Sequence, residues 1–375
     1  MGEQALERVF APAYLWDFVC DGAACGSRCC CGWRIPVDAA ARARLEKLPE
    51  REKIFARLER KGAGWMTRHG ESGNCAFLGG DGLCLLQKRH GEACLPDICD
   101  SYPRVSYHFE GFVERTLALS CPVAARLALL PGEPMRFGER MVPARRASSA
   151  VRPPMEALRW ERALRAFQIR AIAFLQDRKF SLRERFLRLG RFFMAVEAAS
   201  GKTPPEEELL GRCAAEAAAD ADMAPRADPL PRLRYMASLL SELYEAGYPP
   251  DRVAALAARV AEIEAEAERV LYGRSGHILE NLAVNEFFLR LYPFACGGGF
   301  SANFKLFALR FRVAEFSLLL AAAAKAEAPD EERILTMLDR VMERLDHSRV
   351  SDEYLRRRVG EDFDGMTNDA FLAML

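Results

Sequence analysis

Apolar residues recur at alternating spacings of three and four over most of the chain beyond residue 155. This spacing places them on one face of an α-helix. The clearest run begins after Ser181, with Glu184 three residues later, which predicts a capping box at the helix start. Its apolar positions are Leu182, Phe186, Leu189, Phe193 and Val196.

Further helices are predicted by the same periodicity. The apolar positions are Val253, Leu256, Val260, Ile263, Ala267 and Val270 in one run, and Ile334, Leu338, Val341 and Leu345 in another. Proline-rich breaks separate the helices at 203–205, 225–231 and 248–250. The apolar run 316–324 is far shorter than the ~20 residues that cross a bilayer, so we expect a buried helix there. Strands and helices do not alternate, which argues against a doubly wound nucleotide-binding sheet.

One segment shows the alternation of a β-hairpin. Apolar and polar residues alternate over Val105–Leu119 on either side of Glu110 and Gly111, and the second strand leads to Cys121. Between residues 131 and 155 the chain is rich in Pro, Arg and Ser and lacks apolar periodicity, which indicates a linker. We therefore predict a mainly α protein. It has a cysteine-rich module with a small β-hairpin (1–130), a linker (131–155) and a larger helical domain (156–375).

The net charge of the chain and its N-terminal sequence bear on its binding partners and on its location in the cell. Lys plus Arg and Asp plus Glu number 53 each, so the overall charge predicts neither a nucleic-acid partner nor an anionic membrane surface. The first residues contain neither a basic segment nor an apolar core of the kind found in export signals. We expect a cytoplasmic protein without a membrane partner.

Ten of the twelve cysteines lie within the first 121 residues. In a reducing compartment such a group binds metal or carries out redox chemistry more often than it forms structural disulfides. The spacings lack the paired Cys-x2-Cys knuckles of zinc ribbons. The tandem Cys29-Cys30 suits a polynuclear cluster, or two nearby centres, better than one tetrahedral ion. Iron–sulfur is thus favoured over zinc, and zinc over redox thiols. A radical-type cluster loop is excluded because Gly32 stands where its third cysteine is needed.

Several motifs occur in a fixed order along the chain. They are Ala11–Leu15; Cys20-x4-Cys25-x3-Cys29-Cys30-x-Gly32-Trp33; Cys75-x-Phe77-Leu78; Asp81-Gly82-Leu83-Cys84; Leu95-Pro96-x-x-Cys99-x-Ser101-Tyr102-Pro103-Arg104; Ser120-Cys121-Pro122; and Glu280-Asn281-Leu282-x-Val284-Asn285. This order resembles the flagellin lysine-N-methylase family. The likeness extends over most of the chain.

The resemblance implies a cytosolic enzyme that uses S-adenosylmethionine to methylate lysine side chains of flagellin, its protein substrate, and that carries a four-iron four-sulfur (4Fe-4S) cluster. The cysteines that match the family's pattern, and are therefore the implied metal ligands, are Cys20, Cys25, Cys29, Cys30, Cys75, Cys84, Cys99 and Cys121. Cys31 and Cys94 fall outside the pattern. Eight sulfurs exceed the four ligands of one cluster, and the spacing selects no particular four.

Two polar groups are candidates for a catalytic role. Tyr102 beside Arg104 would orient the lysine amine and bind the carboxylate of S-adenosylmethionine, although the same residues also fit a packed helix-to-strand corner, which we favour. Glu280, Asn281 and Asn285 form a polar strip on an apolar helix, where they would line a pocket or tie helices together. The competing function classes are a non-enzymatic metal-binding interaction module and a redox protein.

Overall fold

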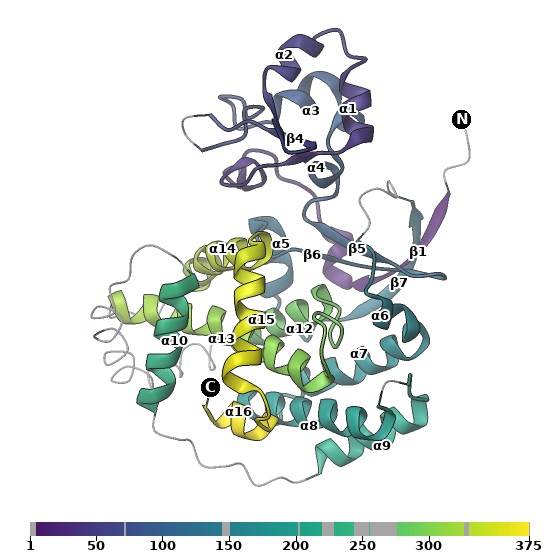
Figure 1. The fold of residues 1–375 in the computed structure, drawn as a ribbon, viewed down its shortest axis with the longest axis vertical. Helices are drawn as coiled ribbons and strands as arrows, with labels where there is room; N and C mark the ends of the chain where they lie inside the picture. The colour runs from purple at the N-terminus through teal and green to yellow at the C-terminus, as the bar shows by residue number, and fades with distance from the viewer. Residues whose placement is uncertain are drawn as a thin grey trace. The chain divides into compact units, whose positions relative to one another are not determined.

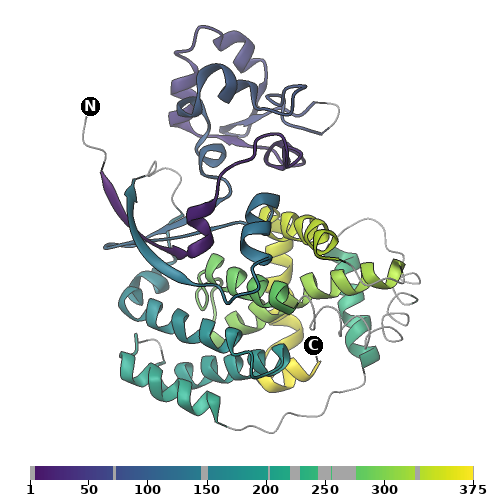
Figure 2. The same ribbon diagram turned by 180° about the vertical axis from the view of Figure 1, so that it is seen from behind.

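The computed structural model describes residues 5–70, 73–144, 151–201, 203–219, 229–243, 255, 276–325 and 330–374. The chain forms two compact units. Unit 1 consists of Met1–Leu127 and Arg136–Arg152, and unit 2 of Ala128–Met135 and Pro153–Leu375. Figures 1 and 2 show the elements of each unit from opposite sides.

Unit 1 contains a four-stranded sheet with the order β5-β6-β1-β7. Strand β1 runs parallel to β6 and antiparallel to β7, and β5 and β6 form an antiparallel hairpin. The bounds are β1 Leu6–Pro12, β5 Arg104–His108, β6 Val113–Leu117 and β7 Phe137–Pro143. The predicted hairpin is thus confirmed, with Val105 opposite Thr116, but it is half of a larger sheet.

The segment predicted as a linker contributes a strand instead. All seven residues of β7 pair with β1, from Leu6 opposite Pro143 to Pro12 opposite Phe137. Because β7 lies at the edge of the sheet, none of its side chains is fully buried, and an edge strand of this kind has no need of apolar alternation. The segment lacks apolar periodicity because it forms an exposed strand. The prediction of a linker over 131–155 was therefore wrong for Phe137–Pro143.

The cysteine-rich part of unit 1 has its own small sheet, with the order β2-β4-β3, and several short helices. The bounds are β2 Pro36–Val37, β3 Leu58–Lys61, β4 Gly64–Thr67, α1 Ala39–Leu45, α2 Arg51–Phe55, α3 Leu85–His90, α4 Asp97–Ser101 and α5 Pro122–Leu129, with 3₁₀ turns η1 Ala13–Asp17, η2 Arg28–Cys30 and η3 Glu92–Cys94. One apolar cluster joins β2, α1, α2, β3 and α3. Its buried members are Val37, Ala41, Leu45, Ile54, Leu58, Cys75, Phe77, Leu86 and Leu95.

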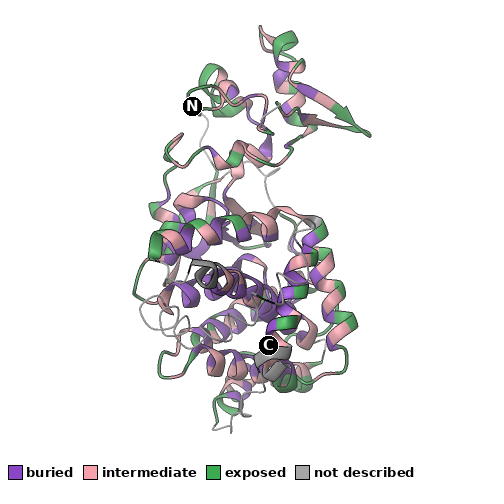
Figure 3. Ribbon diagram, turned by 90° about the vertical axis from the view of Figure 1, so that its left-hand side faces the viewer, coloured by how far each residue is buried: buried purple, intermediate pink, exposed green. Residues whose placement is uncertain are grey.

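The regular elements in the described residues of unit 2 are all helices. Its helices are α6 Met155–Arg159, α7 Glu161–Gln176, α8 Leu182–Ser200, α9 Glu207–Ala218, α10 Pro229–Leu243, α12 Gly276–Leu289, α13 Phe300–Lys325, α14 Glu331–His347, α15 Arg349–Phe363 and α16 Asn368–Met374. Helix α13 contacts α8, α10, α12, α14, α15 and α16. Residues 278–289 of α12 and most of residues 303–319 of α13 are buried, and buried residues, drawn purple in Figure 3, gather in the interior of unit 2. The expected fold class, mainly α with a small hairpin, is confirmed.

Phenylalanine rings fill the interior of unit 2. Phe167 of α7 stacks on Phe192 of α8 with ring centroids 5.0 Å apart, and Phe307 of α13 contacts the Phe287 ring of α12 edge-on at 5.4 Å. All four side chains are fully buried, and each ring pair adds specific contact energy to its hydrophobic burial. These contacts fix α7, α8, α12 and α13 as one core.

Most of the helical predictions can be compared with the structure. The capping box of Ser181 and Glu184 is present, and the apolar positions predicted in α8 and α14 are buried. The break at 203–205 separates α8 from α9, whereas α10 already begins at Pro229, inside the second predicted break. The run from Val253 to Val270 and the third break lie outside the described residues. Within the described residues no helix is long and apolar enough to cross a membrane.

Candidate functional site

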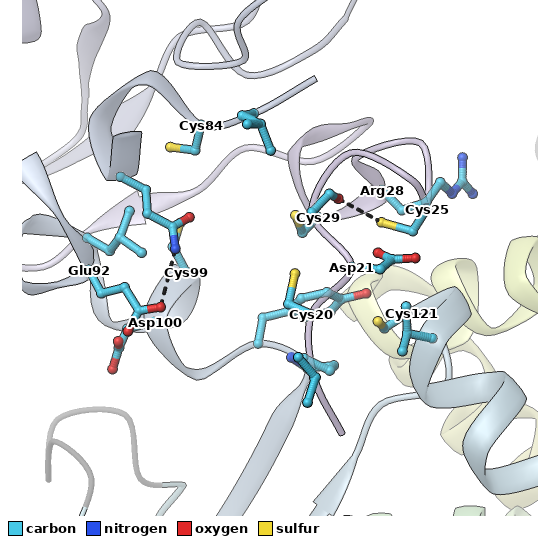
Figure 4. Close-up of a pocket in the computed structure, with 18 of the residues that line it drawn as sticks. Cys20, Asp21, Cys25, Arg28, Cys29, Cys84, Glu92, Cys99, Asp100 and Cys121 are labelled. Carbon is cyan, nitrogen blue, oxygen red and sulfur yellow. Dashed lines mark hydrogen bonds between the residues drawn. The ribbon is translucent and has the colours of Figure 1, made fainter. Parts of the chain in front are cut away.

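A cavity of about 680 Å³ in unit 1 is lined by six cysteines. They are Cys20, Cys25, Cys29, Cys84, Cys99 and Cys121. Figure 4 shows Cys84 and Cys99 on one side of the cavity, and Cys20, Cys25, Cys29 and Cys121 on the other. The volume lies within the range of roughly 300–1,000 Å³ that is typical of small-molecule sites. The structure therefore gathers in one place thiols that are up to a hundred residues apart in sequence.

Short backbone links hold the cysteine-bearing segments together. The amide of Cys75 donates to the carbonyl of Cys30 at 2.8 Å, and Leu78 forms an isolated bridge with Cys84. At the other end, Asp38 caps α1 and its second carboxylate oxygen accepts the Asp97 amide at 2.9 Å, which anchors the start of α4. Cys99 lies on that helix. These links place the thiols through the backbone and do not depend on long side chains.

Charged side chains of both signs line the same cavity. The anionic residues are Asp21, Glu92 and Asp100, and the cationic residues are Arg28, Lys88 and Arg104. Glu92 accepts a hydrogen bond from the side-chain amide of Gln87 at 3.3 Å, which is drawn as a dashed line in Figure 4. A cavity with three carboxylates and three cations offers partners for an ammonium group and for a carboxylate.

Tyr102 and Arg104 line this cavity and also form the helix-to-strand corner between α4 and β5. The Tyr102 hydroxyl donates to Ser120 Oγ at 3.2 Å, and its ring contacts Trp33 with centroids 5.6 Å apart. The Arg104 guanidinium lies over the Phe18 ring, 4.8 Å from its centroid. Both side chains are thus held by packing while they remain on the wall of the cavity.

Burial and the proximity of the thiols to one another shift their pKa values. Burial, and secondarily the nearby thiolates of Cys25 and Cys20, raise the pKa of Cys121 to about 11. The Cys29 and Cys30 Sγ atoms are 4.0 Å apart, and their hydrogen bond lowers the pKa of Cys29 to about 7 while raising that of Cys30. Burial also raises the pKa of Cys99 well above its ordinary value, with added effects from Cys84 and Cys75. Most of these sulfurs therefore favour the protonated form unless a cation is bound.

The donor set matches the chemistry of a soft metal centre. Each of the twelve cysteines is a free thiol. Among the described residues, however, no group of three or more His, Cys, Asp or Glu side chains converges on a single-ion position. Thiolates around one tetrahedral zinc ion lie ~3.8 Å apart, given metal–sulfur bonds of about 2.3 Å. A larger centre, or rotation of the thiol side chains, is needed to engage four sulfurs together.

The polar strip of α12 has structural partners within unit 2. Both carboxylate oxygens of Glu280 accept hydrogen bonds from Arg178, and one also accepts from Arg185 at 2.7 Å. Asn281 donates to the carbonyl oxygens of Leu129 and Pro131. Asn285 is buried, and none of the three residues lines the cysteine cavity. Their contacts agree with the alternative in which the strip ties segments of the chain together.

Sequence reasoning missed several residues on the cavity wall. Asp21 and Asp100 were passed over although each directly follows a candidate cysteine, and Phe18 precedes the cluster by two residues. A charged residue next to a ligand cysteine is a usable signal, because side chains adjacent to a site often face it. The contact between the Trp33 and Tyr102 rings had no signal beyond the Gly32-Trp33 motif, since the two residues are 69 positions apart in the sequence.

Comparisons with known proteins identify relatives of the chain. It is 30% identical over 140 residues to the flagellar biosynthetic protein FliU of Salmonella muenchen, covering 35% of this chain and 83% of that protein. Two lysine-N-methylases, from Salmonella choleraesuis and Salmonella typhimurium, are each 28% identical over 142 residues, or 36% of this chain. These two alignments span about a third, 35%, of the relatives' own length. No solved structure matches.

A family model gives the broadest match. The model described as the FliB lysine N-methylase C-terminal domain covers residues 168–375, which is more than half of the chain and most of unit 2. The class expected from the sequence, protein-lysine N-methyltransferases, is the class of this family. The chain belongs to the FliB lysine N-methylase family.

Proposed function

We propose that this protein transfers methyl groups from S-adenosylmethionine to lysine side chains of flagellin in the cytoplasm, at the cysteine-lined cavity of unit 1. The observation that carries the proposal is the combination of family membership with a cavity that presents thiols, carboxylates and cations together. The names of the relatives support a flagellar role, since one is a flagellar biosynthetic protein and two are lysine-N-methylases.

The reaction forms a bond between the lysine nitrogen and the methyl carbon while the carbon–sulfur bond of the sulfonium breaks. The amine must first lose its proton, because the ordinary lysine pKa is about 10.4. Asp21, Glu92 and Asp100 supply carboxylates that bind the arriving ammonium and accept that proton directly or through water. The leaving product is S-adenosylhomocysteine.

The cationic side chains of the cavity would bind the negatively charged part of S-adenosylmethionine. Arg104 is held over Phe18, and its guanidinium provides bidentate donors for the carboxylate of S-adenosylmethionine. Tyr102 contacts Trp33 and Ser120 and lines the same cavity. Holding both reactants in one orientation is the main contribution that a protein makes to a methyl transfer.

The cavity thiols would hold a four-iron four-sulfur cluster. When bound, such a cluster supplies a redox-active, electron-accepting centre beside the substrates. Buried thiols with raised pKa values, placed by backbone links, are suited to such a group because metal binding stabilises their thiolate form.

Coexpression with flagellin tests the proposal. We expect methylated lysines in flagellin, detected by mass spectrometry, in cells that express this chain, and none in matched cells without it. Glu92→Gln removes one carboxylate of the cavity and should lower methylation about tenfold, the value of one charged hydrogen bond. Glu46→Gln is the matched control, because Glu46, directly after α1, pairs with Arg42 at the surface and does not line the cavity. Equal flagellin methylation with and without the chain would refute the proposed function.

A further inference from the structure

Two exposed apolar side chains lie on the wall of the cysteine-lined cavity. Val19 is 76% exposed, more than any other large apolar side chain in the described part of the chain, and Leu83 is 37% exposed. The other large apolar side chains described as exposed in unit 1 are Leu6, Met141 and Val151, and these do not line the cavity. Exposed apolar side chains gathered beside a polar cavity are typical of a surface that binds a partner.

The backbone directs Val19 toward solvent. The preceding residue, Phe18, is extended, with φ −73° and ψ 116°, and its buried ring lies beneath the Arg104 guanidinium. Successive side chains of an extended segment point to opposite sides, so burial of Phe18 leaves Val19 exposed. Two residues after Val19, the exposed Asp21 lines the same cavity.

A tight turn sets the position of Leu83. The Leu83 amide donates to a carboxylate oxygen of Asp81 at 3.2 Å. Ser27 Oγ donates to the carbonyl oxygen of Gly82, and this bond joins the turn to the loop that follows Val19. Neither bond involves the Leu83 side chain, which remains available for a contact.

The Leu83 side chain lies against the loop that carries Asp21. Gly22 has a positive φ of 65°, and a Cβ atom added to it would lie 3.4 Å from Leu83 Cδ2. Leu83 is therefore next to the residue that follows Asp21, and Val19 precedes Asp21 by two residues. We refer to Val19 and Leu83 as the apolar rim of the cavity.

The charges near the apolar rim suit a lysine side chain. Lys88, which lines the cavity five residues after Leu83, forms a salt bridge with Asp81, so its positive charge is compensated locally. The Asp21 carboxylate attracts an ammonium group. An apolar surface beside it favours a lysine whose neighbour in the substrate is also apolar.

We propose that Val19 and Leu83 dock the lysine-bearing segment of the protein substrate, and that this segment carries a large apolar side chain next to the target lysine. The lysine ammonium would enter the cavity toward Asp21, and the neighbouring apolar side chain would contact the rim. A lysine between polar residues would gain the electrostatic attraction alone. The inference rests on the proposed function for the identity of the substrate.

Paired peptides test the inference. Anaerobically purified full-length protein is given labelled S-adenosylmethionine and synthetic peptides with a single lysine, which differ only in having leucine or serine beside it. We expect the leucine peptide to have a KM about tenfold lower, as burial of one large apolar side chain allows. This preference should disappear in the variant that combines Val19→Ser with Leu83→Ser. With intact flagellin, that variant should raise KM rather than lower kcat.

Met141→Ser is the matched control. Met141 lies on β7 of the same unit, is 59% exposed and does not line the cavity, so its replacement should leave KM unchanged. Circular dichroism checks that each variant is folded. Equal KM values of the wild type for the two peptides would overturn the inference. A wild-type dimer that the rim variant converts to monomers, with no change in the KM for flagellin, would also overturn it, because a second copy would then cover the rim.

Binding measurements separate this inference from the proposed function. Surface plasmon resonance reports the affinity of each variant for immobilised flagellin. If the rim variant binds more weakly than the wild type, but the wild type transfers no methyl group, the activity is refuted and the docking surface stands. If the wild type methylates flagellin with the same KM as the rim variant, the docking surface is refuted and the activity stands. Wild-type protein that neither binds nor methylates flagellin refutes both.

Discussion

Replacing Glu280 by glutamine distinguishes a structural role from a catalytic one. The Glu280 carboxylate is 2% exposed and binds two arginines, Arg178 and Arg185, whose side chains are 40% and 11% exposed. Removing one partner of a buried ion pair typically costs about 3–5 kcal/mol, because the remaining charge is left uncompensated. Glutamine keeps one acceptor oxygen and Arg178 can turn to solvent, so we expect a loss of about 3 kcal/mol in the free energy of unfolding.

Urea unfolding followed by circular dichroism measures this loss. With a dependence of about 2–3 kcal/mol per molar urea, the midpoint of unit 2 should fall by ~1–1.5 M. Glu207→Gln is the matched control, since Glu207 is 79% exposed and its pair with Arg170 at 3.5 Å should contribute nothing measurable. A Glu280→Gln variant that unfolds at the same urea concentration as Glu207→Gln, yet no longer methylates flagellin, would refute the structural role.

Further predictions concern packing, pH and a buried hydroxyl. Gly190→Ala should destabilise unit 2 by about 1–3 kcal/mol in urea unfolding, because the added Cβ would lie 2.8 Å from the buried Phe304 ring, whereas Gly211→Ala on α9 meets nothing closer than 4.0 Å and should not destabilise it. Burial lowers the pKa of His347 from 6.5 to about 4, so the unfolded chain takes up its proton first as the pH falls. The unfolding free energy should therefore decrease between pH 6.5 and 4, and His347→Gln should reduce that decrease. Tyr14→Phe removes a hydroxyl that forms a buried 2.8 Å hydrogen bond with a threonine, and should cost about 1 kcal/mol in the thermal unfolding of unit 1.

Helices could be predicted from sequence wherever one face is buried along the whole element. Helices α8 and α14 carry apolar residues at every third or fourth position, and the capping box marks the start of α8 without any tertiary information. Strand β7 could not be found in this way, because its pairing partner β1 lies more than a hundred residues earlier and its side chains face solvent.

The candidate site was predictable in its chemistry but not in its geometry. Ordered cysteine motifs identified the thiols, and the same motifs included Tyr102 and Arg104. Spacing alone did not separate Cys29 from Cys30, since the structure packs Cys30 against the apolar cluster and places Cys29 on the cavity wall. Likewise, the sequence of the α12 strip fitted a pocket lining and a tie between helices equally well, and only the structure shows that Glu280 is ion-paired with Arg185 of α8 and Arg178 of the loop before it.

The most direct test of the central claim uses purified components. Folded, anaerobically purified protein is incubated with flagellin and S-adenosylmethionine carrying an isotopically labelled methyl group, and flagellin peptides are analysed by mass spectrometry. The proposed function predicts labelled methyl groups on lysine side chains, in an amount that increases with the quantity of protein added. Flagellin that stays unlabelled in the presence of folded, iron-containing protein would contradict it.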